Sequence, residues 1–325
     1  MILAAGLGTR LRPMTHTIPK PMVPILDRPV MGHIVALLRD HGLTEVIANL
    51  HYFPDAVRGY FGDGSEHGIS LEYRYEDELM GTAGGVRNCR DFFGDDDFLV
   101  ISGDAITDID LGAMRNAHRA HDGIATLAVK QVDHTDEFGV VIHGDDMRIQ
   151  GFQEKPDPAE ALSDLANCGI YMFSPEIFDY FPDADFADWA TDVFPALLDN
   201  DVPFYAYAFD DYWNDVGTVD EFRQASFDAV SGAVKIQLDA ELLEEGLYVG
   251  EGTDLGGAVE VEAPAYVGRD CRIGSDVRMQ GTVIIGAGSV IGDRAMLRDT
   301  IIWPDTEIAA DTLLIEAIAG RPAKT

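Results

Sequence analysis

The stretch AYVGRDCRIGSDVRMQGTVIIGAGSVIGDR, residues 265–294, repeats its pattern every six residues. An apolar residue returns at each sixth position from residue 249 to residue 291, and a compact residue follows four positions after each one. The apolar series is Val249, Leu255, Val261, Val267, Ile273, Met279, Ile285 and Ile291. A six-residue period is the signature of a parallel β-helix, in which each hexad forms one short face of a coil.

Glycine follows directly after most members of this apolar series, at Gly250, Gly256, Gly268, Gly274, Gly286 and Gly292. We interpret these glycines as the points where the chain turns from one face to the next. The register slips by one residue near Ile301 and resumes with Ile302 and Ile308. The pattern resembles the left-handed hexapeptide-repeat β-helix, and we expect such a domain over residues 247–319.

Upstream, as far as residue 230, short apolar runs alternate with helical patterns. We expect a helix over Val30–Arg39 and strands at Met1–Ala5, Val46–Leu50, Leu71–Tyr75, Phe98–Ser102 and Ile124–Val129. This alternation predicts an α/β domain over residues 1–230, Rossmann-like, with a mixed and mostly parallel sheet that binds ligands at the carboxyl ends of its strands. Residues 231–246 form the expected linker. Because the first strand is short, we expect the native start to lie a few residues upstream.

The charge of the chain is strongly negative. Asp and Glu total 57 against 23 Lys and Arg, which gives −34, and the composition is rich in Asp and nearly free of Lys. This balance argues against nucleic acid or an anionic membrane as a partner. An Asp-rich surface suits concentrated salt, where self-repulsion is screened, so we expect a halophilic source.

Targeting and cysteine signals are absent from the sequence. No apolar run approaches the length of a membrane span, and the first residues lack the basic region of a secretory signal. The cysteines Cys89, Cys168 and Cys271 are odd in number and far apart, so they indicate neither a disulfide framework nor a zinc cluster. We therefore expect a cytoplasmic, reducing environment.

The charge reverses in residues 1–39. This segment holds Arg10, Arg12, Lys20, Arg28 and Arg39, with Asp27 as its only acid, so its net charge is +5 − 1 = +4. The glycines of the loop after the first strand bring backbone N–H groups close to an anion, and the flanking cations add to this. We infer that the segment holds a polyanion such as a triphosphate.

Taken together, residues 3–13 (LAAGLGTRLRP) and Pro19-Lys20-Pro21 resemble the signature of sugar-1-phosphate nucleotidylyltransferases, also called NDP-sugar pyrophosphorylases. Six further segments match the family in chain order, and the hexapeptide repeats follow where many members carry them. The resemblance therefore covers essentially the whole chain. The six segments are residues 81–85, 102–104, 138–141, 154–156, 167–171 and 213–218.

The resemblance implies roles for residues in these segments. Nucleotide contacts fall on Ala4, Ala5, Gly6, Gly8, Thr9, Gly81, Thr82 and Gly103. The triphosphate and the departing pyrophosphate are assigned to Arg10 and Lys20. Sugar-phosphate contacts fall on Gly139, Glu154, Lys155 and Asn167, of which Lys155 neutralises the phosphate. Asp104 and Asp215 are the expected ligands of Mg²⁺, since a hard cation on phosphate needs only one or two protein carboxylates.

Several functions stay open within this interpretation. The motifs most resemble mannose-1-phosphate guanylyltransferases, with glucose-1-phosphate uridylyl- or thymidylyltransferase as the alternative. A second acetyltransferase activity is disfavoured because all nine histidines lie between His16 and His143, outside the repeats. A non-catalytic regulatory subunit is disfavoured because the expected phosphate and metal residues are all present. We expect a homo-oligomer that assembles through the β-helix.

Overall fold

The computed structural model describes residues 1–244, 246–262 and 264–320. The chain divides into two compact units that do not follow the order of the sequence. The sheet unit consists of Met1–Leu7, Ile34–Ala105 and Ile109–Asp215, and the β-helix unit consists of Gly8–His33, Ile106–Asp108 and the residues from Val216 onward. The boundary expected at residues 231–246 is a division along the chain, and it stays a prediction.

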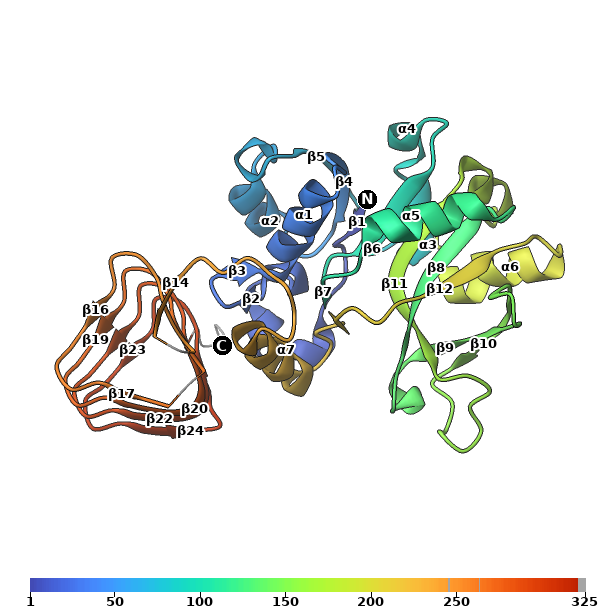
Figure 1. Ribbon diagram of the computed structural model, residues 1–325. Coiled ribbons are helices and arrows are strands. Elements are labelled where there is room, and N and C mark those ends of the chain that lie inside the picture. Colours follow the sequence, from blue (N-terminus) through green and yellow to red (C-terminus); the bar gives the residue numbers. More distant parts are fainter. Residues whose placement is uncertain (245, 263, 321–325) are drawn as a thin grey trace. The chain divides into compact units, whose positions relative to one another are not determined.

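A mixed nine-stranded sheet forms the centre of the sheet unit. Its strands are β1 (Ile2–Leu3), β4 (Glu45–Leu50), β5 (Ser70–Tyr75), β6 (Phe98–Ser102), β8 (Ala125–Gln131), β9 (Gly139–His143), β10 (Ile149–Glu154), β11 (Leu165–Phe173) and β12 (Tyr205–Ala208). The order is β10-β9-β11-β6-β1-β4-β5, with β8 paired to β11 and β12 (Figure 1). The predicted Rossmann-like fold class is confirmed. Parallel pairing joins β6, β1, β4 and β5, whereas β11 is antiparallel to β6, β8 and β9.

Helices connect these strands. They are α1 (Val30–Asp40), which begins in the β-helix unit, α2 (Pro54–Phe61), α3 (Gly81–Arg87), α4 (Arg90–Phe93), α5 (Leu111–Ala120) and α6 (Phe194–Asp199), with a π-helical turn at Trp189–Val193. A short strand, β13 (Trp213–Asn214), ends the unit. The core is aromatic: Trp189 stacks on Phe173 with ring centroids 4.6 Å apart, and Tyr171 meets Phe194 edge to face. This packing fixes β11 on the sheet.

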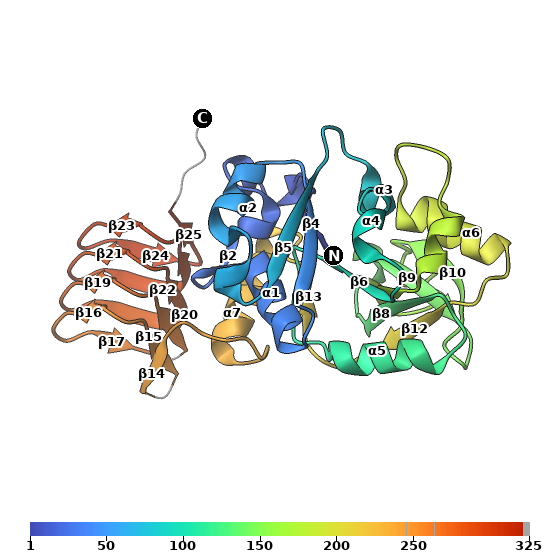
Figure 2. The ribbon, with the colours of Figure 1, turned by 90° about the horizontal axis from the view of Figure 1, so that it is seen from above.

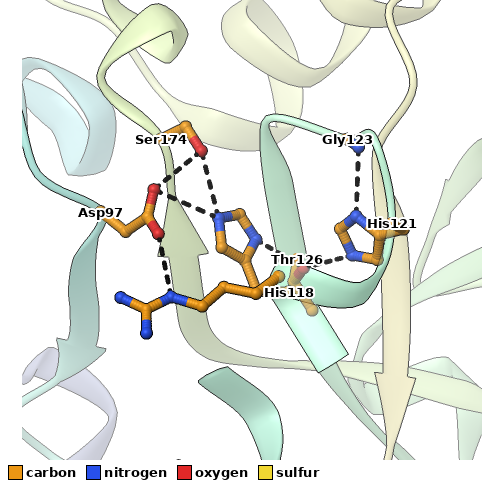
Figure 3. A network of polar contacts seen from close by, with 7 residues as sticks. Asp97, His118, His121, Gly123, Thr126 and Ser174 are labelled. Atoms are coloured by element: carbon orange, nitrogen blue, oxygen red, sulfur yellow. Dashed lines mark hydrogen bonds and ion pairs between the residues drawn. The ribbon is translucent and has the colours of Figure 1, made fainter. Parts of the chain in front are cut away.

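A chain of polar contacts, buried at His118 and Thr126, joins α5 to β8 (Figure 3). The Gly123 N–H donates to Nδ1 of His121, so the neutral ring carries its proton on Nε2 and donates to the Thr126 hydroxyl, 2.8 Å away. The Thr126 hydroxyl can then donate to Nδ1 of His118, whose Nε2 faces the Ser174 hydroxyl. Burial is also the largest cause lowering the pKa of both histidines. For His118 the Asp97 carboxylate, 3.9 Å from Nε2, opposes this shift.

The β-helix unit stacks parallel coils, as predicted (Figure 2). Its coil strands are β15 (Leu247–Val249), β16 (Asp254–Leu255), β17 (Glu260–Val261), β18 (Ala265–Val267), β19 (Arg272–Ile273), β20 (Arg278–Ile285), β21 (Val290–Ile291), β22 (Met296–Ile302), β23 (Glu307–Ile308), β24 (Leu313–Ile315) and β25 (Ile318–Ala319). Leu247 pairs with Ala265, and Ala265 pairs with Val283, so one coil takes 18 residues, or three hexads. The left hand of the coil stays a prediction.

The remaining elements of this unit precede the coils. They are the hairpin β2 (Pro24–Ile25) and β3 (Arg28–Pro29), the strand β7 (Ile106–Thr107), helix α7 (Val219–Ser231), the edge strand β14 (Glu241–Glu244) and three-residue 3₁₀ turns at Thr9–Leu11, Met14–His16 and Lys20–Met22. The Thr218 hydroxyl accepts from the Glu221 N–H and so caps α7, and Gly232 ends the helix with φ 78°.

The repeated glycines have a different role from the one predicted. A Cβ on Gly256 or Gly274 would fall 2.6 Å from backbone atoms of the next coil, and neither glycine has a positive φ. They allow the coils to approach each other, and they do not make the turns. The left-handed corner positions belong to other residues, which stack from coil to coil, such as Asp276, Arg294 and Asp311. Glycine is required here for space.

Two further expectations concern membranes and cysteines. Among the described residues, no helix has the length and apolar character needed to cross a membrane. The three cysteines are buried, each with a free thiol. Burial is the main cause that raises the pKa of the Cys89 thiol to about 12. Cys89 is therefore an inert part of the core.

Candidate functional site

The carboxyl ends of three parallel strands coincide at one edge of the sheet. Leu3 pairs with Asn49 on β4 and with Ser102 on β6. The residues that follow these strands therefore lie together, in the place where α/β sheets bind ligands. Ala4 and Ala5 are buried behind this edge, whereas the Gly6 backbone is exposed, and no atom lies within 4 Å of where its Cβ would be. The Gly6 backbone is thus accessible to a ligand.

Gly103 packs against the first of these strands. Its N–H donates to the Leu3 carbonyl, 2.9 Å away, and a Cβ would meet the side chain of Ile2 at 2.8 Å. The predicted nucleotide contact at Gly103 is therefore also a site of close strand packing. Asp104 follows directly and is half-buried. The Asp104 carboxylate therefore lies just beyond the carboxyl end of β6.

A polar bridge holds the loop after β1. No pattern in the sequence indicated it. Asn49 accepts from the Ala4 N–H at 2.9 Å and donates to the carboxylate of Glu76 at 2.7 Å. The second oxygen of Glu76 accepts from the Met80 N–H at 3.1 Å. A Cβ on Gly85 would lie 2.6 Å from the Asn49 amide. The loop after β1 and the start of α3 are therefore tied together through two buried side chains.

The start of α3 carries the predicted nucleotide contacts Gly81 and Thr82. The N–H groups of Ala83 and Gly84 donate to the Ala187 carbonyl. Gly81 has φ 79°, and a side chain there would collide with that carbonyl. The Thr82 hydroxyl donates to Asp188 at 2.8 Å. This anchors the first turn of α3 to the segment before the π-helical turn, an arrangement that the sequence did not suggest.

The predicted sugar-phosphate residues gather on neighbouring strands. Gly139 on β9 pairs with Glu154 on β10, and a Cβ on Gly139 would lie 3.1 Å from the Glu154 carboxylate. Lys155 follows, exposed, with its N–H donating to the Phe138 carbonyl at 3.1 Å. Asn167 lies on β11, beside β9, and its side-chain oxygen accepts from the Gly169 N–H. The structure therefore brings all four predicted residues to one part of the sheet.

Lys155 has an unusual backbone. Its φ is 46°, in the left-handed region, although it carries a long side chain and precedes Pro156. Residues held there cost of order 1–3 kcal/mol and cluster at functional sites. Val216, which follows Asp215, has φ 44°, and such a value is rarer still for a β-branched residue. Strain thus falls on the predicted sugar-phosphate lysine and beside a predicted metal ligand.

The two candidate metal ligands lie beside the same strand. Asp104 follows β6, which pairs with β11, and a Cβ on Gly169 of β11 would touch Ser102. Asp215 follows Trp213, whose indole N–H donates to the Cys168 carbonyl of β11 at 3.1 Å. Burial is the main cause that raises the pKa of the Cys168 thiol. The negative charge of Asp215 is a lesser cause that acts in the same direction. Two carboxylates beside one strand suit Mg²⁺ as a donor set.

The remaining predicted residues, Gly8, Thr9, Arg10 and Lys20, belong to the β-helix unit. Gly8 has φ 60°, and its carbonyl accepts from the Thr15 hydroxyl at 2.7 Å. A Cβ on Gly8 would lie 3.0 Å from the Cβ of Lys20, so the glycine loop and the Pro-Lys-Pro segment pack on each other. Arg10 is exposed on its 3₁₀ turn, whereas Lys20 is only 8% exposed.

Comparison with known proteins gives this arrangement a family. The nucleotidyl transferase family matches residues 1–231. The chain belongs to this family. A UTP–glucose-1-phosphate uridylyltransferase of Synechocystis sp. is 41% identical over 264 residues, which cover 77% of this chain and 68% of the relative. A mannose-1-phosphate guanylyltransferase of Mycobacterium tuberculosis is 34% identical over 266 residues, 80% of this chain and 74% of the relative.

Solved structures agree with the family fold. A Bacillus anthracis protein in complex with a sucrose matches with a TM-score of 0.65 at 28% identity, over 73% of this chain and 95% of that one. HddC from Yersinia pseudotuberculosis matches with a TM-score of 0.61 at 26% identity, over 69% of this chain and 96% of that one. Members of the nucleotidyl transferase family are enzymes, and the named relatives of this chain act on sugar-1-phosphates. The predicted family and enzyme class are confirmed.

Proposed function

We propose that this nucleotidyl transferase joins a hexose-1-phosphate to a nucleoside triphosphate and releases pyrophosphate. An oxygen of the sugar phosphate attacks the α-phosphorus and forms a new P–O bond. The bond from this phosphorus to the bridging oxygen breaks, and pyrophosphate leaves with the electron pair. Both reactants are anions, so the protein acts mainly by positioning them and by neutralising charge. The observation that carries the proposal is the edge where Gly6, Gly103 and Asp104 follow parallel strands.

The charged residues divide the work in this proposal. Lys155 holds the phosphate of the sugar, and Glu154 and Asn167 hydrogen-bond to its hydroxyls. Arg10 and Lys20 bind the triphosphate and stabilise the departing pyrophosphate. Mg²⁺, held by Asp104 and Asp215, supplies further neutralisation of phosphate charge when it is bound.

The nucleotide and the sugar are a finer proposal. The motifs of residues 81–85 and 103–111 favour mannose-1-phosphate with GTP, and the M. tuberculosis relative supports that pair. The Synechocystis relative shares more of its sequence with this chain, which favours glucose-1-phosphate with UTP. We put the uridylyl pair first because of this greater identity, and the guanylyl pair second.

A substrate panel tests both levels of the proposal. Pyrophosphate release is measured in molar KCl with GTP, UTP, dTTP or ATP, each with glucose- or mannose-1-phosphate. We expect one pair to exceed the others by at least about tenfold, since a site that hydrogen-bonds a base rejects one lacking the matching groups. Faster turnover of GTP with mannose-1-phosphate would reverse our order. No release with any pair would contradict the reaction itself. Activity that rises with KCl would support adaptation to salt.

The β-helix is proposed as the assembly surface of a homo-oligomer. Met296 and Leu313 are paired residues on adjacent coils, 41% and 58% exposed, and Ile315 is exposed on the same strand as Leu313. This apolar patch on a regular sheet face supports contact with a second copy. Light scattering in molar KCl should give a multiple of the 35.5 kDa chain mass. A monomeric mass would contradict this proposal.

A further inference from the structure

The segment that carries Gly8, Arg10 and Lys20 is part of the same compact unit as the β-helix. The family match ends at residue 231, before the coils begin at Leu247. Residues proposed to bind the triphosphate are therefore packed with a domain that lies outside the family match. The contacts within this unit show how the two are joined.

Asp27 connects the hairpin of β2 and β3 to the coils, and we call this connection the joint. It lies in the turn of the hairpin between β2 and β3, and its carboxylate accepts two hydrogen bonds from the coils. The Tyr266 hydroxyl donates to one oxygen at 2.9 Å, and the Ala287 N–H donates to the other at 2.6 Å. Gly268 lies directly beneath, where a Cβ would collide with the carboxylate. Asp27 thus fits into a gap in the coil surface that glycine keeps open.

Neighbouring contacts support the same hairpin. Arg28 donates to the carboxylate of Asp239 at 2.7 Å, which ties β3 to the chain that leads into the first coil. Arg223 of α7, which packs on β2, donates to the carbonyls of Asp299 and Glu316 in the coils. The hairpin is therefore fixed to the coils both directly and through α7.

The hairpin is also connected to the segment that carries Gly8, Arg10 and Lys20, which we propose binds the triphosphate. The Val23 N–H donates to the Lys20 carbonyl at 3.0 Å, and the Val30 N–H closes the hairpin on the Val23 carbonyl at 3.0 Å. Lys20 packs on Gly8, whose carbonyl is held by Thr15. An unbroken series of contacts thus runs from Tyr266 and the Ala287 backbone to the glycine loop.

We propose that Asp27 is a positioning residue through which the β-helix holds the triphosphate-binding segment in its working geometry. The inference rests on the proposed function. A carboxylate is suited to this joint because it accepts both hydrogen bonds at once, and hydrogen bonds to a charged acceptor are shorter and stronger than neutral ones. Asp27 is the only acidic residue in residues 1–39, a segment whose other charged residues are Arg and Lys. Its position in the joint explains that exception.

The test compares Asp27→Asn with wild type in the full-length chain. The amide keeps the size but replaces one acceptor with a donor that faces the Tyr266 hydroxyl or the Ala287 N–H. We expect the KM for the nucleoside triphosphate to rise about tenfold, while the KM for the sugar phosphate stays within about twofold, because Lys155 lies in the other unit. Tyr266→Phe should shift the same constant by a smaller factor. Asp254→Asn, an exposed aspartate on the coils, is the matched control.

Hydrogen exchange provides a readout that is independent of turnover. Asp27→Asn should speed amide exchange in residues 8–23 and leave exchange in β6 and β11 unchanged. An unchanged KM for the triphosphate in a folded variant, or an equal rise in both constants, would overturn the inference while leaving the reaction in place. Absence of turnover in wild type would overturn the proposed function, and the exchange result would still decide the role of Asp27.

Discussion

The two units use exceptional backbone positions in different ways. In the β-helix, positive φ values recur at coil corners such as Asp276, Arg294 and Asp311, and tight glycines recur between coils. In the sheet unit, Lys155 has a positive φ in isolation, and Gly6 has open space around it. A positive φ or a tight glycine that recurs from coil to coil is a consequence of the repeat and is needed to form the coils. An exception that occurs once, at the end of a strand, needs a local explanation, and for Lys155 and Gly6 we propose that this is the binding of substrate.

The largest effect should come from the carboxylate at the end of β6. We expect Asp104→Ala to lower kcat by about 10³-fold, comparable to the loss of one charge-stabilising group in other active sites, with unfolding unchanged. Turnover and urea unfolding, both in molar KCl, measure the two quantities. Asp96→Ala, at an exposed aspartate before β6, is the control and should leave both unchanged. Near-normal turnover of Asp104→Ala would remove Asp104 from the proposed metal site.

Two glycine substitutions, one in each unit, test most directly whether glycine has a different role in each. Gly274→Ala places a methyl group 2.6 Å from the Asp293 backbone nitrogen, so the free energy of unfolding should fall by about 1–3 kcal/mol while the folded enzyme keeps its activity. Gly6→Ala adds its methyl group to open space, so stability should change by no more than about 1 kcal/mol.

In the second variant, kcat/KM for the triphosphate should fall about tenfold, since glycine permits close approach of the backbone to a ligand. Urea unfolding and initial rates across triphosphate concentrations check the pair. Loss of stability in Gly6→Ala, or loss of activity in a folded Gly274→Ala, would show that the two kinds of glycine are not distinct.

The difference between the units also explains what the sequence could predict. The six-residue period located the coils because each hexad repeats the same local geometry, and the apolar run Phe98–Ser102 matches β6. The bridge through Asn49 and Glu76 had no such signal, because it joins a single polar residue on β4 to another that follows β5. The same is true of Asp27, which was visible only as an unexplained acid among cations. Contacts between segments distant in sequence depend on the tertiary fold, which no local pattern encodes.

Histidines give the coils and the residues upstream of them different responses to acid. The described coils contain no histidine, whereas His33, His118 and His121 have lowered pKa values upstream. Burial is the main cause for His33, whose pKa falls to about 4 from an ordinary 6.5. The unfolded chain therefore binds more protons in this range. The stability from neutral His33 is fully present above pH 6.5 and is lost as the pH falls toward 4, a change on the order of 3 kcal/mol at most.

Urea unfolding of wild type and His33→Gln between pH 7.5 and 4.5 tests this. The variant should be less stable at pH 7.5, and the gap should narrow as the pH falls. Protonation of carboxylates contributes to both proteins and cancels in the comparison. Parallel stability curves at all pH values would show that His33 titrates normally in the folded protein.

The smallest expected change in stability concerns the isolated strain at Lys155. Asparagine tolerates the left-handed region better than lysine, so Lys155→Asn should raise the free energy of unfolding by up to about 1 kcal/mol. The same change removes the charge proposed to hold the sugar phosphate, and the KM for that substrate should rise roughly tenfold. Asp276→Asn, at a coil corner with φ 57°, is the matched change in the β-helix and should leave both KM values unaltered. If Lys155→Asn gained no stability, or kept its affinity for the sugar phosphate, the positive φ at Lys155 would belong with the periodic corners as a feature of the fold alone.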